Sequence, residues 1–366
     1  MEKVKIGIIG TGVGLRTHFP AFNKLDNAEV VAIAGSSLAR SEEFATNYNI
    51  PRACADYKEL CEMEDIDLVC VTAPNRFHVE MVKYAIKCNK HIICEKPVSE
   101  NKDEIEELEA LSRDYKKILV VDHQLRYNPY MAKIKSLLEN GEIGIPYLVR
   151  INQEGVSFAK KDAKWSWSFD GKQGGGVRLA MASHFNDLIQ YWFGNREILA
   201  VSGNLNPVFK KRIDSNGVER EVDASTICSA KIDLANELSL MYTINAGAYR
   251  KFIFEIDIYG DKGQLHFDLE NKLSIYRQIN IGFEEKVEVE GVFDDERENK
   301  ASLFSGSFRY FAPKIIEAIL SGDNQPIERS ALIIDAIYNG VLLEAIQESA
   351  NSGESVVLNK RVNGYV

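Results

Sequence analysis

The sequence predicts two domains: an α/β Rossmann domain with a parallel, doubly wound sheet, followed by an α+β domain with a large, mainly antiparallel sheet. The length of 366 residues is enough for two ordinary domains. In about the first third of the chain, short apolar runs alternate with longer periodic segments, which is the rhythm of βα units. Further along, long alternating stretches are broken by tight turns, which is typical of antiparallel strands.

Five short apolar runs are the predicted strands of the first domain. Most of them are rich in β-branched residues, as strands covered on both faces must be. The clearest helix between them is 101–116, where Asn101 and Glu104 have N-cap and N3 spacing and Ile105, Leu108 and Leu111 share one stripe. The predicted strands are 5–9, 30–34, 68–72, 92–94 and 118–121.

The second domain begins with a predicted helix over 130–138 and another around His184. Strands at 226–232 and 252–259 alternate apolar and polar residues, and turns are expected at 215–217 and 261–263. Apolar residues on both sides of this sheet predict that the face without helices is buried in a partner subunit. A final helix over 331–349 is predicted to bury Leu332, Ile333, Ala336, Ile337, Val341, Leu342 and Ala345.

Composition excludes several classes of protein. With 45% hydrophobic and 27% charged residues, the chain is neither disordered nor embedded in a membrane, and no apolar run approaches the roughly 18 residues of a spanning helix. The formal charge of −10 argues against a general nucleic-acid or anionic-membrane surface. Six cysteines without a C-x-x-C pair and a start without a signal sequence predict a reducing, cytoplasmic compartment.

A glycine-rich loop follows the first predicted strand directly. It reads Gly10-Thr11-Gly12-Val13-Gly14-Leu15. Gly10 suits the tight turn and Gly12 the close approach of a pyrophosphate to a helix N-terminus. The third glycine of a dinucleotide fingerprint is replaced by Leu15, with Gly14 one place early. The context predicts an NAD or NADP site, and a glycine-rich turn without a ligand is the alternative.

The end of the second predicted strand bears on the choice of nucleotide. An NAD site usually has an acidic residue there, whereas this chain has Ser36 and Ser37, with Arg40 one turn on. Small hydroxyls and a nearby guanidinium favour a 2′-phosphate, so NADP is preferred to NAD. Alternatively, Arg40 lies on a solvated helix face.

Two further segments follow the third and fourth predicted strands. Because the carboxyl ends of parallel strands form one edge, both segments should border the same crevice as the glycine loop. A lysine between a glutamate and a proline can be desolvated there and tuned for proton transfer, or it can be an ordinary surface lysine. The predicted cofactor contacts in these segments are Thr72, Pro74, Asn75, His78, Glu95 and Lys96.

The order and spacing of five motifs resemble those of the Gfo/Idh/MocA family. The resemblance implies an NAD(P)-dependent oxidoreductase of sugars, cyclitols or related polyols. It also implies a cofactor domain over 1–123, a substrate-binding and oligomerisation domain over 124–366, and a homodimer or homotetramer formed through the second sheet. The motifs are Gly10-x-Gly12 with His18, Thr72-x-Pro74-Asn75-x-x-His78, Glu95-Lys96-Pro97, Arg126-Tyr127-Asn128-Pro129, and Gly174-Gly175-Gly176 followed by Ser183-His184-x-x-Asp187.

The same resemblance implies that Lys96 and His184 are the catalytic residues. The family pattern places an aspartate one helical turn before the histidine, and this chain has Ala180 there. Loss of that carboxylate lowers the pKa of a nearby histidine and removes a counter-charge from a nearby lysine. We favour an active enzyme that uses Lys96 and His184. The alternative is a regulatory protein that binds nucleotide and sugar without turnover.

Five further residues complete the predicted site. They are substrate-binding candidates near the junction of the domains or in the second domain. Arg126 could instead form an inter-domain ion pair, and the tryptophan could be a core or dimer-contact residue. His18 and His78 are expected to have structural roles beside the cofactor, and no metal site is predicted because no metal-ligand spacing occurs. The substrate-binding candidates, with Lys96 and His184, are His123, Arg126, Tyr127, Trp165 and Asp187.

Overall fold

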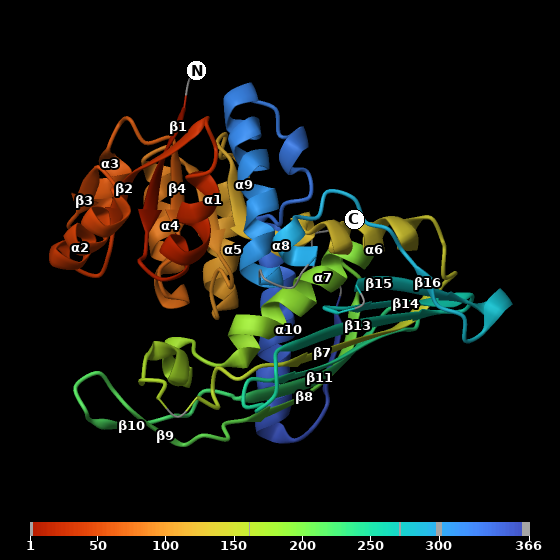
Figure 1. The fold of residues 1–366 in the computed structure, drawn as a ribbon. Helices are drawn as coiled ribbons and strands as arrows, with labels where there is room; N and C mark the ends of the chain where they lie inside the picture. Colours follow the sequence, from red (N-terminus) through yellow and green to blue (C-terminus); the bar gives the residue numbers. More distant parts are fainter. Residues whose placement is uncertain (1–2, 161, 271, 298–301, 361–366) are drawn as a thin grey trace. The chain divides into compact units, whose positions relative to one another are not determined.

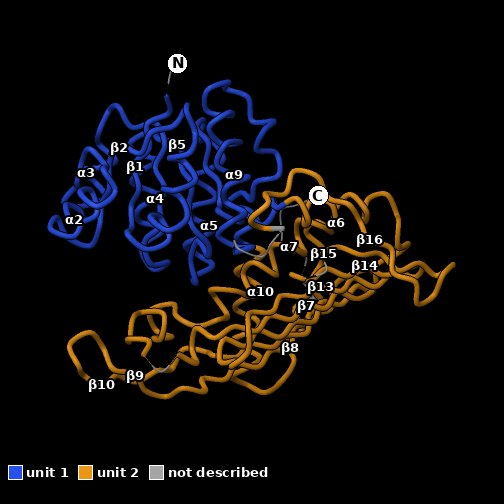
Figure 2. The backbone as a smooth tube through the Cα atoms, in the orientation of Figure 1, with its two compact units in different colours: residues 1–128, 300–337 blue, residues 129–299, 338–366 orange. Residues whose placement is uncertain are grey.

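The computed structural model describes residues 3–160, 162–270, 272–297 and 302–360. The chain divides into two compact units (Figure 2). The first comprises Met1–Asn128 and Lys300–Ile337, and the second comprises Pro129–Asn299 and Tyr338–Val366. The single boundary predicted after residue 123 lies near the first crossing, but the C-terminal part of the chain contributes to both units.

The first unit contains a parallel six-stranded sheet in the order β3-β2-β1-β4-β5-β6. This confirms the predicted Rossmann class. Strands β1 to β4 are labelled in Figure 1. All five predicted strands are present, and β3 is added; it is only three residues long and includes the polar Arg52, so it lacks a strand signature. The strands are β1 (Val4–Ile9), β2 (Ala28–Ala34), β3 (Arg52–Cys54), β4 (Leu68–Val71), β5 (His91–Glu95) and β6 (Leu119–Asp122).

Helices of the first unit follow the βα order. The Asn101 side chain caps α5 by accepting a hydrogen bond from the Asp103 amide at 2.9 Å, as the sequence predicts, but the helix ends at Ser112 and Leu111 is 47% exposed. The helical segments are η1 (Gly14–His18), α1 (Phe19–Phe22), α2 (Leu38–Tyr48), α3 (Tyr57–Glu62), η2 (Asn75–Phe77), α4 (His78–Lys87), α5 (Lys102–Ser112), η3 (Gln124–Tyr127), α9 (Leu303–Ser321) and η8 (Gln325–Ile327).

The late helix α9 completes the core of the first unit. Its Phe308 and Phe311 are at most 1% exposed and pack in one cluster with Phe22 of α1 and with Ile8 and Ile93 of the sheet. Aromatic side chains of this size bury enough apolar area to contribute several kcal/mol each. The return of the chain to the first unit therefore follows from the need to cover this face of the sheet.

The second unit contains a nine-stranded sheet in the order β16-β15-β14-β13-β7-β12-β11-β8-β17. Its pairs are antiparallel except β12 with β7. Strand β17 follows the last helix and pairs with β8, which the sequence analysis missed. A separate hairpin joins β9 (Lys211–Ile213) and β10 (Glu219–Glu221). The sheet strands are β7 (Pro146–Glu154), β8 (Ile198–Asn206), β11 (Ile227–Leu234), β12 (Leu238–Asn245), β13 (Ile253–Gly260), β14 (Gly263–Asp268), β15 (Lys272–Arg277), β16 (Glu285–Lys286) and β17 (Val356–Lys360).

The predicted helices around 130–138, His184 and 331–349 are all present. Leu332 precedes the last helix and is 50% exposed, so its predicted burial is wrong. No helix in the described ranges is long and apolar enough to cross a membrane. The helical segments are α6 (Pro129–Glu139), η4 (Trp167–Phe169), η5 (Gly171–Gln173), η6 (Arg178–Ala182), α7 (Ser183–Phe193), η7 (Gln278–Asn280), α8 (Asp294–Arg297) and α10 (Ile333–Ser352).

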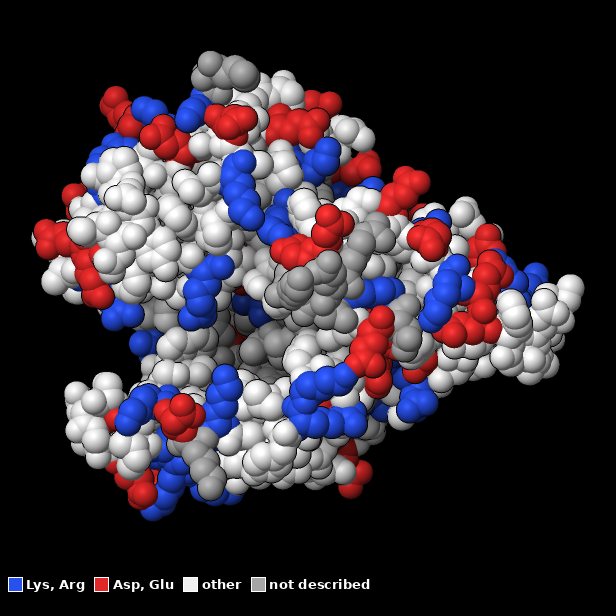
Figure 3. Space-filling view, viewed as in Figure 1, with Lys and Arg blue, Asp and Glu red and all other residues white. Residues whose placement is uncertain are grey.

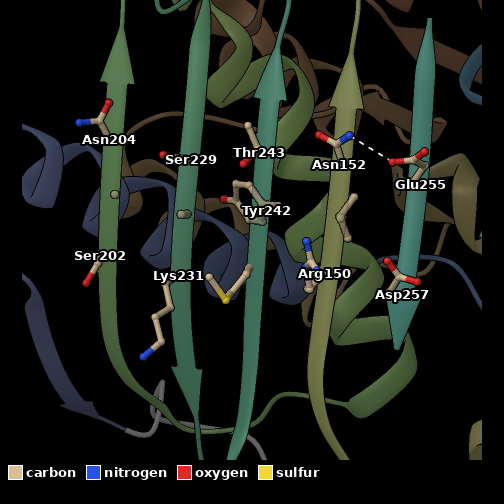
Figure 4. Close-up of a pocket in the computed structure, with 14 residues that line it drawn as sticks. Arg150, Asn152, Ser202, Asn204, Ser229, Lys231, Tyr242, Thr243, Glu255 and Asp257 are labelled. Atoms are coloured by element: carbon tan, nitrogen blue, oxygen red, sulfur yellow. Dashed lines mark hydrogen bonds between the residues drawn. The ribbon is translucent and has the colours of Figure 1, made fainter. Parts of the chain in front are cut away.

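One face of the second sheet is apolar and the other is largely polar. In β12, Leu240 and Ile244 are at most 1% exposed, whereas the intervening Met241 is 43% exposed. Figure 4 shows the polar face, where Asn152 of β7 donates a hydrogen bond to Glu255 of β13 at 3.2 Å. The predicted apolar pattern on both sides is therefore wrong for the middle of this sheet.

Candidate cofactor site and catalytic residues

Gly10 and Gly12 occupy the turn between β1 and η1. Gly10 has φ of +111°, and a Cβ there would lie 2.5 Å from the Thr72 carbonyl oxygen, so only glycine fits. A Cβ on Gly12 would meet nothing within 4 Å, so the backbone at Gly12 faces open space. A tight turn with an open backbone position is what a pyrophosphate needs.

Gly14 explains why the fingerprint departs from its usual spacing. It begins a π-helical turn, and a Cβ there would lie 2.4 Å from Thr72 Oγ1 and 2.5 Å from Ile8 Cγ2. Gly14 therefore provides the close contact between helix and strand that the third glycine normally provides. Leu15, at 2% exposed, joins the hydrophobic core, while Val13 is half-buried in the loop.

The end of β2 places Arg40 against the glycine loop. Arg40 Nε donates a hydrogen bond to Thr11 Oγ1 at 3.2 Å, and its guanidinium lies over the Phe44 ring. Ser37 Oγ caps α2 by accepting from the Arg40 amide at 3.3 Å, while Ser36 is exposed. Arg40 is thus exposed but oriented toward the loop, rather than only toward solvent.

Hydrogen bonds connect the carboxyl ends of β1, β4 and β5. Thr72 Oγ1 donates to the Ile9 carbonyl at 2.8 Å. The His78 ring lies between two carbonyl oxygens, with Nε2 2.7 Å from Ala73 and Nδ1 2.9 Å from Pro97. Burial lowers the pKa of His78 and favours the neutral ring, which donates its single N–H to one of these two carbonyls. His78 therefore connects the β4 end to the residue after Lys96.

Pro74 and Asn75 form the turn that carries the chain from β4 into α4. Pro74 precedes the short η2 turn, and Asn75 is its first residue. The Asn75 side chain is buried, and its Oδ1 atom has no hydrogen-bond partner among the residues that the structure describes. A buried amide oxygen of this kind at the sheet edge is suited to a polar ligand.

Lys96 follows β5 directly and is partly buried. The Lys96–Pro97 peptide is cis, and the Lys96 amide donates a hydrogen bond to Glu95 Oε2 at 3.2 Å. Burial lowers the pKa of Lys96, and the negative charges of Glu95 and Asp122 oppose that shift. These surroundings differ from those of a fully solvated surface lysine.

A buried cluster beside Lys96 was missed by sequence reasoning. His18 Nε2 lies 2.9 Å from Asp122 Oδ2 and 3.5 Å from Glu95 Oε1, although 104 positions separate His18 from Asp122. Among the described residues, this is the group whose His, Asp and Glu ligand atoms are close enough to hold a metal ion. The signal available in the sequence was the pair of carboxylates, one at the end of each of two neighbouring strands.

The residues after β6 pack within the first unit. Arg126 Nη1 lies 3.3 Å from Asp335 Oδ2 and donates to the Arg329 carbonyl at 3.4 Å, so the predicted inter-domain ion pair is instead internal to this unit. The Tyr127 hydroxyl lies 2.8 Å from Ser330 Oγ. His123 is buried, and burial together with Arg126 holds its pKa well below the usual range.

In the second unit, a π-helical turn leads into α7. His184 and Asp187 lie in the first two turns of α7, at 4% and 1% exposed. Asn339 of α10 donates a hydrogen bond to the Ser183 carbonyl at 2.7 Å and accepts one from Asn186 at 3.4 Å. These contacts fix the helix that carries His184.

Trp165 lies against the β9–β10 hairpin. Its Nε1 donates a hydrogen bond to the Glu221 carbonyl at 2.9 Å, and its amide donates to the Ile213 carbonyl at the same distance. The Arg220 guanidinium lies 6.0 Å from the centre of its ring. Trp165 is half-buried, so the alternative that it is a core residue is wrong.

Charge on the molecular surface is mixed. On the face shown in Figure 3, basic and acidic side chains are interspersed rather than gathered into one extended basic surface. A different polar surface is the hollow of about 510 Å³ on the open face of the second sheet, bordered by Arg150, Lys231 and Asp257 among others (Figure 4).

Comparison with known proteins extends these observations. A curated uncharacterised oxidoreductase of Synechocystis sp. is 29% identical over 268 residues, covering 73% of this chain and 72% of its own. The myo-inositol 2-dehydrogenase of Thermotoga maritima is 25% identical, with 72% and 75% covered.

Solved structures share the fold over nearly the whole chain. Levoglucosan dehydrogenase in complex with NADH and levoglucosan superposes with a TM-score of 0.85 at 22% identity, covering 97% of this chain and 99% of its own. A super-repressor mutant of Gal80p from Saccharomyces cerevisiae superposes with a TM-score of 0.80 at 16% identity, with both chains fully covered.

Two family profiles match the chain in order. Residues 4–123 match "Oxidoreductase family, NAD-binding Rossmann fold", and residues 135–358 match "Oxidoreductase family, C-terminal alpha/beta domain". The resemblance seen in the motifs is confirmed: the chain belongs to the Gfo/Idh/MocA family of NAD-binding oxidoreductases.

Proposed function

We propose that this protein transfers a hydride between NAD(P) and a hydroxyl or keto carbon of a sugar, cyclitol or related polyol. The observation that carries the proposal is the sheet edge of the first unit, where the glycine loop after β1 and Lys96 after β5 are connected through Thr72 and His78. A relative named as an inositol dehydrogenase and a structural neighbour holding NADH with levoglucosan support the substrate class.

The residues of the first unit fit a dinucleotide. The open backbone at Gly12 suits a pyrophosphate, and Ser36, Ser37 and Arg40, which follow β2, are proposed to contact the adenosine ribose of the nucleotide. Arg40 and the lack of a carboxylate over 34–37 favour NADP over NAD. Bound NAD(P) supplies the carbon that gives or accepts the hydride. Thr11, Val13, Thr72, Pro74 and Asn75 complete the proposed contacts.

Lys96 is proposed to move the proton at the substrate oxygen. A partly buried lysine with a lowered pKa exchanges its proton more readily near neutral pH than a solvated lysine does. His184 is proposed as the second proton donor or acceptor, and Asp187 and His123 as substrate contacts. Arg126, Tyr127 and Trp165 have defined packing partners, so their proposed role is to shape the site.

Ala180 is the observation that favours a second candidate, a sensor that binds nucleotide and sugar without turnover. The fold is shared with the super-repressor mutant of Gal80p. The test uses purified wild-type protein, a panel of sugars and cyclitols with their keto forms, and both nucleotides in both redox states. We expect a change in absorbance at 340 nm. Tight nucleotide binding by calorimetry without any such change would favour the sensor.

The open face of the second sheet is proposed to bind a second copy of this chain. Basic side chains (Arg150, Lys231) and acidic ones (Glu255, Asp257) share this face, so a two-fold axis can pair opposite charges. We expect a dimer or tetramer in light scattering after gel filtration, and Lys231→Glu with Met241→Glu should shift it toward the monomer. A monomeric wild type would contradict this proposal.

The cytoplasmic location of the protein is also a prediction from the sequence.

A further inference from the structure

His18, Glu95 and Asp122, called here the buried triad, are not used by the proposed reaction. Glu95 and Asp122 are direct neighbours in the register of β5 and β6, so their side chains leave the sheet on the same face. His18 Nε2 reaches both carboxylates from the end of η1. The His18 and Asp122 side chains are fully buried, and Glu95 is nearly so.

The charge of the triad follows from its geometry. Two carboxylates in one buried place repel each other, and an imidazolium between them relieves the repulsion. Burial opposes protonation of His18, but Asp122, Cys70 and Glu95 outweigh it and hold the pKa of His18 well above its usual range. Burial and the charge of Glu95 raise the pKa of Asp122 to about 6. At neutral pH the triad therefore holds one cation and two anions.

Other groups around the triad add no charge at neutral pH. Cys70 of β4 contacts His18, whereas Cys94 of β5 precedes Glu95 and points to the other face of the sheet, and burial raises the pKa of both thiols. Helix α9 contributes the Phe308 ring, which stacks on His18 with ring centres 4.0 Å apart. One net negative charge is thus enclosed at the ends of β5 and β6.

Glu95 connects this charge to Lys96. Its Oε2 atom accepts the hydrogen bond from the Lys96 amide at 3.2 Å, while its Oε1 atom faces His18 at 3.5 Å. His78 and His123 also face Lys96, but burial lowers the pKa of both, so both rings are neutral at neutral pH. Among the described residues of the first unit, the charges that act on Lys96 are therefore those of Glu95 and Asp122.

We propose that the buried triad is a positioning device for Lys96: Glu95 fixes its backbone, and the enclosed negative charge stabilises its ammonium form. The consequence for turnover rests on the proposed function, whereas the effect on Lys96 itself does not.

The direct test is a titration of Lys96 by NMR in protein labelled at lysine Cε, with its signal assigned by its loss in Lys96→Arg. In Asp122→Asn, which keeps the shape of the side chain, we expect Lys96 to titrate about one pH unit lower than in wild type. The matched control is Glu109→Gln, which neutralises a buried carboxylate of α5 that pairs with Arg113, the residue after this helix. An unchanged titration in Asp122→Asn, or an equal shift in the control, would overturn the proposal.

A second measurement uses wild-type protein and so does not depend on whether a triad variant folds. In wild type labelled with ¹⁵N-histidine, the His18 signal can be identified by its contacts with the Phe308 ring. We expect His18 to be an imidazolium at pH 7.5. A neutral ring would overturn the assignment of one cation and two anions to the buried triad. Stoichiometric zinc in the purified protein, measured by plasma mass spectrometry, would also overturn it, because His18 would then be a metal ligand.

The pH dependence of kcat distinguishes the two proposals. If wild type is active, Asp122→Asn should move the limb that reports Lys96 to lower pH by the same interval, with an unchanged KM for the nucleotide. If wild type turns over no sugar or cyclitol, the proposed function fails, and the Lys96 titration still decides whether the triad acts on Lys96. A uniform loss of kcat without a moved limb would mean a purely structural role.

Discussion

The two sheets of this protein use their polar residues in opposite ways. The parallel sheet of the first unit is apolar along its strands and carries Thr72, Glu95, Lys96 and Asp122 at or just beyond the carboxyl ends. The larger sheet of the second unit carries polar side chains along the middle of its strands, on one face. A parallel sheet covered on both faces confines chemistry to its edge, whereas an open sheet offers a whole face for association.

Replacing Lys96 is the strongest way to test the edge as a catalytic site. Lys96→Met should reduce kcat by about two to four orders of magnitude, because it removes the proposed proton donor and acceptor. Nucleotide affinity should change little, since the glycine loop is intact. Lys87→Met on α4 is the control. Stopped-flow rates and calorimetry measure the two effects, and equal kcat in both variants would contradict the assignment.

Two glycines of the loop are expected to have different roles, Gly14 in packing the helix on the sheet and Gly12 in binding the nucleotide. Gly14→Ala should lower the free energy of unfolding by about 2 kcal/mol, because its Cβ would collide with Thr72 and Ile8. Gly12→Ala should leave the melting temperature unchanged and weaken nucleotide binding about tenfold, because the added methyl enters the space proposed for the pyrophosphate. Equal melting and equal affinity in the two variants would contradict this division of roles.

The smallest expected effect lies on the open sheet. Hydrogen bonds to Asp257 and Asp268 raise the pKa of His266 to about 9. A raised pKa stabilises the folded protein below the usual value of about 6.5, and this contribution is lost as pH rises through about 9. We expect wild type to lose about 1 kcal/mol of unfolding free energy between pH 6.5 and 9.5, relative to His266→Gln. Parallel pH curves for the two proteins would contradict this expectation.

Local patterns predicted the fold well where periodicity was strong. The five apolar runs of the first unit became strands, and Asn101 capped its helix. Strand β3 was missed because three residues carry no period, and β17 because its pairing with β8 joins segments far apart in the chain. The prediction of apolar residues on both faces of the second sheet was wrong. Apolar residues alternate along the strands with polar ones such as Lys231 and Asp257, and the polar ones lie together on one face.

Site prediction was limited in the same way. The glycine loop and the Glu95-Lys96-Pro97 segment are contiguous, so a motif reveals them. The buried triad depends on the register of β5 with β6 and on the position of His18 over their ends, which no short motif encodes. Gly14 was harder to interpret, because its close contact with Thr72 and Ile8 depends on a π-helical turn that the sequence pattern does not reveal.

The return of α9 to the first unit has a consequence for synthesis of the chain. Phe308 and Phe311 cover a face of the Rossmann sheet, and the Arg126 ion pair requires Asp335. The nucleotide-binding half therefore cannot close while it emerges from the ribosome, and most of the second sheet is made before the first is covered. A fragment ending near residue 128 would expose the apolar surface around Phe22 and His18, so the half that emerges first stays uncovered until most of the second sheet has been made.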